Sequence, residues 1–375
     1  MNIGFDAKRA IQNNTGLGNY SRYVIDILSR FYPENDYVLF CPKQVQKSVL
    51  PTSIQDRKNV FLLYPACLFK FFSALWRLCF CKEDIKKQKI NVFHGLSNEL
   101  PLGIRRTGVP AVITIHDLIF MRFARYYSLF DRWIYGYKVR KSCRAAKMII
   151  AVSECTKQDI ITFLGVPADK ITVVYQGCSP DFCKRITEND RRNIAAKYHL
   201  PEIFLLNVGT IEPRKNGLLI AKALLHLPEH IHWVTVGKKT KYQNEIESFA
   251  MSHQISHRIH IFNDIPFEDL PGLYQTASIF VYPSFFEGFG IPVIEALNSE
   301  IPVIAATGSC LEEVGGHDSV YLPPDNEYLW AQQVQKILKN SETRTKMVAA
   351  GKKYVARFNE QYIAETLMKI YSSLC

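Results

Sequence analysis

The sequence predicts an α/β protein built from two doubly wound parallel sheets. Short apolar runs rich in β-branched and aromatic residues alternate with helical patterns, which is typical of parallel strands joined by crossover helices. This alternation stops in a polar stretch between residues 177 and 200 and then restarts. With 375 residues, 47% of them hydrophobic, the chain is long enough for two domains, each with its own core.

Strands are expected in both halves of the chain. The first half has NIGFDA (2–7), YVLFCP (37–42), VFLLYP (60–65), INVFHG (90–95), AVITIHD (111–117), MIIAVS (148–153) and ITVVYQG (171–177). The second has FLLNVGT (204–210), HWVTVG (232–237), RIHIFND (258–264), SIFVYPS (278–284), PVIAA (302–306) and SVYLPP (319–324). The polar stretch between the two sets carries turn residues and charges, so we place the domains at 1–185 and 186–355.

Positive charge is concentrated in the first part of the chain. Residues 1–150 hold 24 Lys and Arg against 10 Asp and Glu, whereas residues 151–375 hold 22 against 25. The first domain should therefore face an anionic partner such as a membrane surface, a phosphate-bearing substrate or nucleic acid. The ten cysteines are scattered, and MNIGFDAKRA has no signal-peptide hydrophobic region, so we expect reduced thiols in a cytoplasmic protein without a metal site.

The run ACLFKFFSALWRLCFCKEDIKKQK (66–89) is the strongest candidate for contact with an anionic membrane. Lys70, Ser73 and Arg77 fall on one face at helical spacing, and the rest is largely apolar, which predicts an interfacial helix. The alternative is an amphipathic helix packed on the core of its own domain. A spanning helix is disfavoured because two cations interrupt the run. A second basic and aromatic run, 121–147, supports contact with a membrane.

The stretch PSFFEGFGIPVIEAL (283–297) places two carboxylates around a glycine-rich turn. Glu287 lies beside glycines that allow the backbone to approach a ligand closely. Glu295 is expected in the first turn of a helix, where the helix dipole favours a carboxylate even without a ligand. The free N–H groups of Val293 and Ile294 would suit a phosphate. A phosphate cradle beside two carboxylates that can bind hydroxyls describes a nucleotide-sugar site.

Other candidates also follow predicted strands. In NVGTIEPRKN (207–216), Gly209 ends a strand, and Arg214 and Lys215 could clamp a diphosphate, with a solvated basic turn as the alternative. The strand AVITIHD delivers His116 at its carboxyl end, where a purely structural histidine is the alternative. Gly16 and Gly18 in TGLGNY open a helix, but this turn lacks the third glycine of a dinucleotide fingerprint.

Together these elements resemble glycosyltransferase family 4. FVYPSFFEGFGIPVIEALNSEIPVIAA (280–306) is similar to the family's donor-site signature, and TGLGNY, HD, VSE and GTIEPRKN occur in the family's order over nearly the whole chain. The resemblance implies the GT-B arrangement, in which two Rossmann-like domains face a central cleft and a final helix, 356–375, packs back on the first domain. It also implies retention of anomeric configuration and no metal or other cofactor.

The resemblance implies roles for matching positions around the donor sugar. Glu287 would contact its hydroxyls, the main chain of Gly288, Phe289 and Gly290 would lie against it, and His116 would lie nearby.

The same resemblance assigns the rest of the donor. Glu295 would hold the nucleotide ribose, and Arg214 and Lys215 would bind the diphosphate. Gly16 and Gly18 match the loop that approaches the phosphates and the acceptor.

We therefore expect a retaining glycosyltransferase that moves a sugar from a nucleotide-diphosphate sugar to a glycan or lipid-linked acceptor in cell-envelope polysaccharide synthesis. The GTIEPRKN segment favours GDP-mannose by resemblance, and the basic first domain favours a peripheral position on the cytoplasmic face of a membrane. The cation pair argues against a glycoside hydrolase. A nucleotide-sugar 2-epimerase and a non-catalytic membrane or nucleic-acid binder are alternatives, although acidic residues in the expected cleft argue against nucleic acid.

Overall fold

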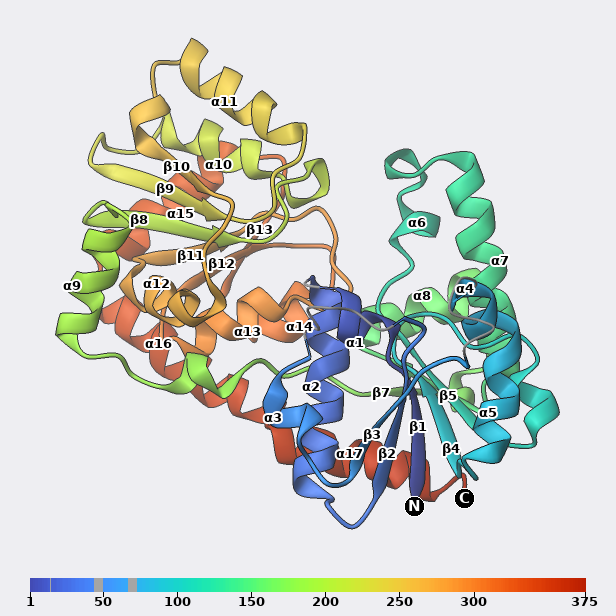
Figure 1. The fold of residues 1–375 in the computed structure, drawn as a ribbon. Helices are drawn as coiled ribbons and strands as arrows, with labels where there is room; N and C mark the ends of the chain where they lie inside the picture. Colours follow the sequence, from blue (N-terminus) through green and yellow to red (C-terminus); the bar gives the residue numbers. More distant parts are fainter. Residues whose placement is uncertain (14, 44–49, 67–72) are drawn as a thin grey trace. The chain divides into compact units, whose positions relative to one another are not determined.

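The chain folds into two α/β units, each built on one parallel sheet (Figure 1). The structure is a computed structural model, and it describes residues 1–13, 15–43, 50–66 and 73–375. Unit 1 comprises Met1–Gly177 and Phe358–Cys375, and unit 2 comprises Cys178–Arg357. The predicted pair of doubly wound domains is confirmed.

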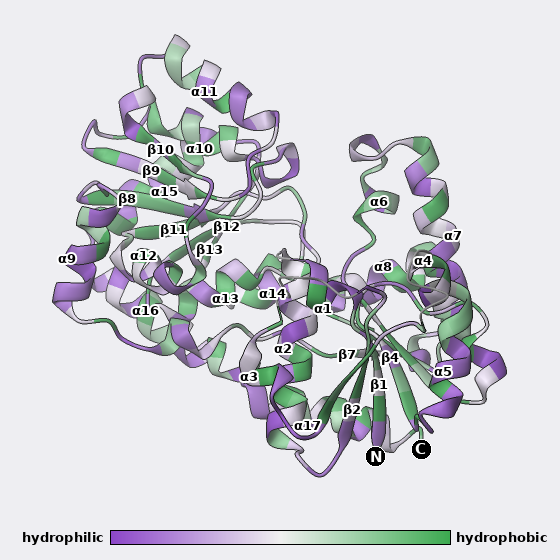
Figure 2. Cartoon of the chain, in the orientation of Figure 1, coloured by the Kyte–Doolittle hydropathy of each residue, from purple (hydrophilic) through white to green (hydrophobic). Residues whose placement is uncertain are grey.

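The strands of unit 1 are β1 (Asn2–Asp6), β2 (Asp36–Phe40), β3 (Val60–Leu63), β4 (Val92–Gly95), β5 (Ala111–Ile115), β6 (Met148–Ala151) and β7 (Ile171–Val173). They form one sheet in the order β3-β2-β1-β4-β5-β6-β7, with every pair parallel. Each of these strands is predicted from the sequence, because strands buried on both faces are nearly continuous apolar runs. Figure 2 shows them as mostly hydrophobic.

The helices of unit 1 cover both faces of this sheet. They are α1 (Lys8–Gln12), α2 (Gly16–Phe31), α3 (Thr52–Gln55), α4 (Ser73–Leu75), α5 (Cys81–Lys87), α6 (Ile119–Arg122), α7 (Leu129–Ala145), α8 (Glu154–Leu164) and α17 (Glu360–Ser372). Side chains of α1, α2 and α17 share one hydrophobic core with β1 and β2. Side chains of α5, α7 and α8 share a second core with β4, β5 and β6. The predicted return of the last helix to the first domain is therefore observed.

Unit 2 repeats the design with its own elements. Its strands are β8 (Ile203–Val208), β9 (Ile231–Val236), β10 (Ile259–Phe262), β11 (Ile279–Tyr282), β12 (Val303–Ala306) and β13 (Val320–Leu322). Its helices are α9 (Glu188–Lys197), α10 (Gly217–Leu224), α11 (Tyr242–Ser252), α12 (Leu270–Thr276), α13 (Ile291–Asn298), α14 (Leu311–Gly315), α15 (Glu327–Lys339) and α16 (Ser341–Val355). The parallel sheet has the order β10-β9-β8-β11-β12-β13.

The change of direction in this order locates the place where ligands bind in doubly wound sheets. From β8 the chain builds outward to β10, and it then returns to β11 on the other side of β8 and builds outward to β13. Crevices form where such an order reverses, at the carboxyl ends of the strands. In unit 2 this point lies after Val208 of β8 and Tyr282 of β11.

The boundaries of the two units differ slightly from those placed on the sequence, because the chain joins unit 2 at Cys178 rather than at residue 186. A short helix, η6 (Pro180–Cys183), carries Phe182, which is fully buried in unit 2. Its ring packs edge-on against those of Phe267 and Tyr274, with centroids 5.9 and 5.3 Å away. These ring contacts hold residues 178–185 on unit 2.

The segment expected to lie on a membrane is partly packed on unit 1 in its described part. Cys81 and Ile85 are buried there, whereas Leu75 and Phe80 are exposed. Lys70 lies outside the described residues. Arg77 is 8% exposed, and it pairs with Asp6 (2.7 Å) and Glu99 (2.8 Å), so the prediction that Arg77 faces a membrane is wrong. A π-helical turn, η2 (Trp76–Phe80), separates α4 from α5 and shifts the helical phase that the prediction assumed. Within the described part of the chain, no helix has the length and apolarity to cross a bilayer.

Candidate active site

Two strand ends and two turns build the candidate site in unit 2. After β8 the chain passes through Gly209 into a single turn, η7 (Pro213–Lys215), and after β11 it passes through residues 283–290 into α13. Gly209 has φ +149, and a Cβ on Gly237 would lie 1.7 Å from the Gly209 carbonyl oxygen. Glycine is therefore needed for the close approach of these strand ends.

A buried ion cluster occupies the switch point. Glu287 is 8% exposed, and its Oε1 lies 2.6 Å from the Lys215 Nζ while its Oε2 lies 3.0 Å from the Arg214 Nη1. Arg214 also pairs with Glu212 at 2.6 Å. The cations predicted from one loop and the carboxylate predicted from another are thus in direct contact.

Backbone contacts fix the two turns against each other. The Arg214 Nη1 donates to the Phe286 carbonyl (2.7 Å), and the Phe285 N–H donates to the Arg214 carbonyl (2.9 Å). Asn216 has a left-handed backbone (φ 56), and its side-chain amide donates to the carbonyls of Pro283 (3.2 Å) and Pro324 (2.7 Å). Fixed turns keep the charges in place before any ligand arrives.

The electrostatics of the cluster favour an ionised Glu287. Burial alone would raise the pKa of Glu287, but Lys215 and Arg214 outweigh it and lower this pKa to about 2. Burial and Arg214 lower the pKa of Lys215, while Glu287 opposes them. The Lys215 Nζ also donates to the Tyr282 hydroxyl at 2.5 Å. Because Glu287 stays ionised at neutral pH, it suits hydroxyl binding better than proton donation.

Glu295 has the opposite environment. Its carboxylate accepts from the Tyr274 hydroxyl (2.7 Å), and burial raises its pKa to about 7. The helix begins at Ile291, which makes Glu295 its fifth residue, so the expected placement of Glu295 in the first turn, favoured by the helix dipole, is wrong. Burial, not the dipole, dominates this carboxyl group.

The glycine-rich turn packs against Cys310 and Leu311. Gly290 has φ +117, and a Cβ there would lie 2.8 Å from the Leu311 side chain. The Cys310 thiol donates to the carbonyls of Phe289 (2.7 Å) and Glu287 (3.2 Å). Gly288 lies between these two residues in the sequence, so one thiol contacts the turn on both sides of this glycine.

The start of α13 differs from the expectation of free amides. The Val293 N–H donates to the Gly290 carbonyl at 2.9 Å, so it is not free in this structure. Val293 and Ile294 are both buried. A phosphate contact through Val293 would require this bond to open.

The remaining predicted residues belong to unit 1. His116 is buried and its Nε2 donates to the Leu96 carbonyl (2.9 Å), while the Tyr20 ring packs edge-on against it. Burial lowers the pKa of His116 to about 4, so the imidazole is neutral at pH 7. Gly16 starts α2, and a Cβ on Gly18 would lie 1.9 Å from the Asn13 carbonyl oxygen. Gly18 is thus needed for loop packing, whatever else it does.

Family models match both halves of the chain. The model described as "Glycosyl transferases group 1" matches residues 190–354, and the model described as "Glycosyltransferase Family 4" matches residues 20–182. The chain belongs to glycosyltransferase family 4. The enzyme class, a glycosyltransferase, follows from this membership.

Similar proteins support the assignment of this glycosyltransferase. "O-antigen chain mannosyltransferase B" of Escherichia coli is 28% identical over 376 residues, covering 96% of each chain. "O-antigen chain mannosyltransferase RfbU" of Salmonella typhimurium is 27% identical over 248 residues, covering 66% of this chain and 65% of its own.

Solved structures share the fold. Anabaena Alr3699/HepE, in complex with UDP and glucose, has a TM-score of 0.78 at 16% identity and full coverage of both chains. WaaG, "a glycosyltransferase involved in lipopolysaccharide biosynthesis", has a TM-score of 0.75 at 15% identity, with 99% of each chain covered.

Sequence reasoning missed several residues of the candidate site. Cys310 follows β12, the strand next to β11, and its place after a strand end could have drawn attention to it. Tyr282 ends β11, which is a similar signal. Tyr274 lies within α12 and had no signal, because only its packing brings it to Glu295. In the described part of the chain, no group of three or more His, Cys, Asp or Glu side chains could hold a metal ion.

Proposed function

We propose that this glycosyltransferase moves a mannosyl residue from a nucleotide-diphosphate mannose, GDP-mannose in the first instance, to a glycan or lipid-linked saccharide of a cell-envelope polysaccharide. The observation that carries this proposal is the Arg214–Lys215–Glu287 cluster at the switch point of unit 2. It combines two cations that can bind a diphosphate with a carboxylate that is ionised at neutral pH and can bind sugar hydroxyls. The mannose preference is supported by the names of the two O-antigen relatives.

The cluster suggests how the leaving group is stabilised. Cleavage of the bond between the anomeric carbon and the diphosphate leaves negative charge on the diphosphate, which Arg214 and Lys215 can neutralise. We propose that these two side chains, without a metal ion, are sufficient for this task. Because both are fixed before the donor binds, little reorganisation is needed during the reaction.

The donor would compete with the resting ion pairs. Glu287 is paired with Arg214 and Lys215 in this structure, and a diphosphate would take over part of that pairing. The freed carboxylate oxygens can then accept hydrogen bonds from the sugar. We propose that Glu295 holds the ribose hydroxyls once Tyr274 shares its carboxylate.

We also propose retention of configuration by front-face attack, in which the departing diphosphate accepts the proton of the acceptor hydroxyl. The low pKa of Glu287, about 2, supports this scheme because it makes Glu287 a poor proton donor at neutral pH. In this scheme His116 of unit 1 lies near the donor sugar, and Gly16 and Gly18 approach the phosphates and the acceptor.

Donor identity is tested by measuring thermal shifts with GDP-, UDP-, ADP- and dTDP-sugars and then transfer from the stabilising donor. GDP-mannose should stabilise the enzyme most, and chelation with EDTA should not reduce transfer. Arg214→Gln should lower kcat by ~10²–10³, the loss expected for one donor to developing charge. A stronger shift with a UDP-sugar would overturn the donor assignment.

Role assignments have a separate test. Glu287→Gln should lower kcat/KM by at least ~10-fold, because a buried charged hydrogen-bond acceptor is worth ~1.5–3 kcal/mol. An unchanged kcat/KM would remove Glu287 from the site. Interconversion of sugar epimers without an acceptor would identify a 2-epimerase instead.

A further inference from the structure

The outer face of α7 in unit 1 carries exposed aromatic and cationic side chains in one continuous stripe. Its members recur every three or four residues, so they share one side of the helix. We call this stripe the α7 face, and its residues are Phe130, Trp133, Tyr137, Arg140, Lys141 and Arg144, all exposed. The opposite side of α7, with Val139 and Cys143, packs into the core of unit 1.

The start of this stripe is apolar and open to solvent. Leu129 is 80% exposed, Phe130 69%, Trp133 70% and Tyr137 54%. Single exposed apolar residues are ordinary, but four that are contiguous at one helix end indicate a surface that another body covers. These side chains do not pack in the core of unit 1, because α7 contacts that core through its opposite side.

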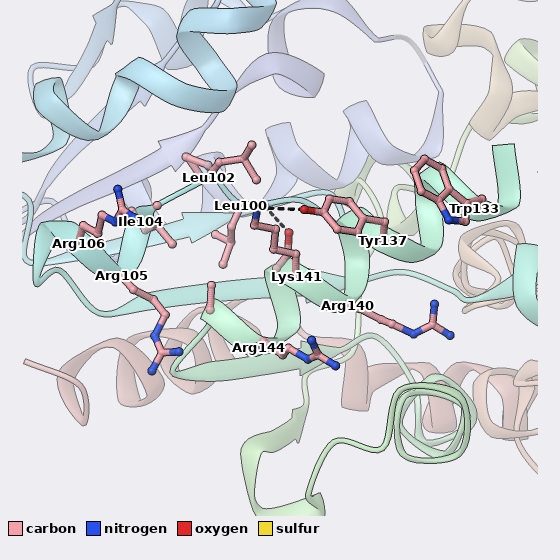
Figure 3. A pocket seen from close by; sticks show the side chains of 14 residues that line it. Leu100, Leu102, Ile104, Arg105, Arg106, Trp133, Tyr137, Arg140, Lys141 and Arg144 are labelled. Carbon is pink, nitrogen blue, oxygen red and sulfur yellow. Dashed lines mark hydrogen bonds between the residues drawn. The ribbon is translucent and has the colours of Figure 1, made fainter. Parts of the chain in front are cut away.

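The second half of the stripe is cationic. Arg105 and Arg106 of η3 (Ile104–Thr107) join Arg140, Lys141 and Arg144 around a groove of about 600 Å³ (Figure 3). Among the residues that the structure describes, no acidic side chain lines this groove. Within the described part of the chain, none of these five cations forms an ion pair. The acid of α7, Asp131, accepts instead from Ser128 at 2.7 Å.

The aromatic and cationic parts of the α7 face are in contact along the helix. The rings of Trp133 and Tyr137 are nearly parallel (18°), with centroids 6.3 Å apart, and the Lys141 Nζ donates to the Tyr137 hydroxyl at 3.2 Å. Rings with one polar edge beside cations are typical of side chains at the boundary between lipid and water. A base could stack on Phe130, but the aliphatic Leu129 beside it is covered better by acyl chains than by a polynucleotide.

We propose that the α7 face, together with the adjoining Leu129, Arg105 and Arg106, rests on an anionic lipid bilayer. Leu129, Phe130 and Trp133 lie in the interface and the five cations lie over acidic headgroups. This combination of apolar insertion and charge attraction gives reversible surface binding. The inference rests on the proposed function only in supposing that the acceptor is presented at a membrane. Vesicle binding is measured without donor or acceptor, so it can fail or succeed independently of transferase activity.

The test is co-sedimentation of the full chain with phosphatidylcholine vesicles, alone or mixed with phosphatidylglycerol. The native protein should bind the mixed vesicles, and added salt should weaken this binding. Arg140→Gln with Lys141→Gln and Arg144→Gln should lower the partition coefficient on mixed vesicles by roughly 100-fold, the loss expected for three surface cations. Phe130→Ser with Trp133→Ser should lower binding at every salt concentration.

A matched control loses the same charge elsewhere. Lys238, Lys239 and Lys241 are exposed in unit 2, and their triple change to Gln should leave binding within about 2-fold of native, because they lie outside the α7 face. Circular dichroism of each variant confirms folding.

Three outcomes would overturn the proposal. One is equal loss in both triple variants, which would indicate net charge alone. Another is retention of binding in the α7 variants with loss on changing Lys86, Lys87 and Lys89, which would place the contact on α5. The third is absence of vesicle binding together with a salt-dependent shift of DNA or RNA in a gel, which would favour a polynucleotide.

Discussion

Replacing Glu295 with glutamine should stabilise the free protein at pH 8, whereas replacing Glu287 with glutamine should destabilise it. The two carboxylates lie at either end of one short stretch, yet their environments move their pKa values in opposite directions. Burial raises the pKa of Glu295 to about 7, so its ionised form is disfavoured in the folded state. Cations lower the pKa of Glu287 to about 2, so its ionised form is favoured.

The sign and size follow from proton linkage. Between pH 4.5 and about 7 the folded state keeps a proton on Glu295 that the unfolded state has released, so stability falls as pH rises through that window. At ~1.4 kcal/mol per pH unit, the ionised carboxylate costs at most ~3 kcal/mol above pH 7. Glutamine removes this cost and can still accept from Tyr274. For Glu287, the ion pairs add stability above pH 4.5 that is lost as pH falls towards about 2.

The assay is urea denaturation of the full chain at several pH values. Unfolding is monitored by circular dichroism and by tryptophan fluorescence. At pH 8, Glu295→Gln should raise the free energy of unfolding by up to ~3 kcal/mol. Glu287→Gln should lower it by ~3–5 kcal/mol, because Lys215 is left buried without its counter-ion. The advantage of Glu295→Gln should shrink as pH falls towards 4.5.

Either of two results would refute this reasoning. If both substitutions shifted the free energy of unfolding in the same direction at pH 8, the opposite environments would not be real. If the effect of Glu295→Gln did not change between pH 8 and pH 5, ionisation of that carboxylate would not be its cause.

Three further substitutions test unit 1. Gly18→Ala should lower the thermal midpoint in a dye-binding melt, because its Cβ would stand 1.9 Å from the Asn13 carbonyl oxygen. Arg77→Met should cost ~3–5 kcal/mol in urea denaturation, because it leaves the buried Asp6 carboxylate without its partner. His116→Gln should reduce the loss of stability as pH falls from 6.5 to about 4, because the unfolded imidazole gains a proton in that window and the buried one does not.

Matched controls separate these causes from general damage. Gly16→Ala should be mild, because a Cβ at Gly16 meets nothing within 4 Å. Arg30→Met should cost no more than ~1 kcal/mol, because the Arg30–Glu360 pair is partly exposed to solvent, unlike the buried Arg77–Asp6 pair. An effect of Gly16→Ala as large as that of Gly18→Ala would contradict the steric explanation, and equal losses for the two arginines would contradict the burial argument.

The sequence predicted most of the fold because parallel strands buried on both faces leave an unmistakable apolar pattern. It also predicted that Arg214 and Lys215 would lie near Glu287. The loops that carry these residues follow strands whose carboxyl ends share one edge of the sheet. It could not predict the pairing geometry, the Cys310 thiol behind the turn or the Tyr274 contact. Those depend on packing between elements, which has no local signature.

Arg77 shows the limit of helical periodicity. Its spacing from Lys70 and Ser73 predicts that all three lie on one polar face of a helix. From that face, together with the apolar residues around it, we predicted contact with a membrane. The structure instead pairs it with Asp6, a residue 71 positions earlier at the end of β1. Periodicity describes one helix, and it carries no information about a carboxylate delivered by a distant strand.

The position of α17 has a consequence for the order in which the chain can fold. The hydroxyl of Tyr371, in this last helix, forms a hydrogen bond with Nδ1 of the buried His94 of β4 (2.7 Å), and Nε2 of His94 forms one with the hydroxyl of Thr114 of β5 (2.8 Å). Unit 2 is therefore an insertion into unit 1, and unit 1 lacks part of its hydrophobic core until residues 358–375 have left the ribosome. Unit 2 can complete its folding first, although its sequence is made second.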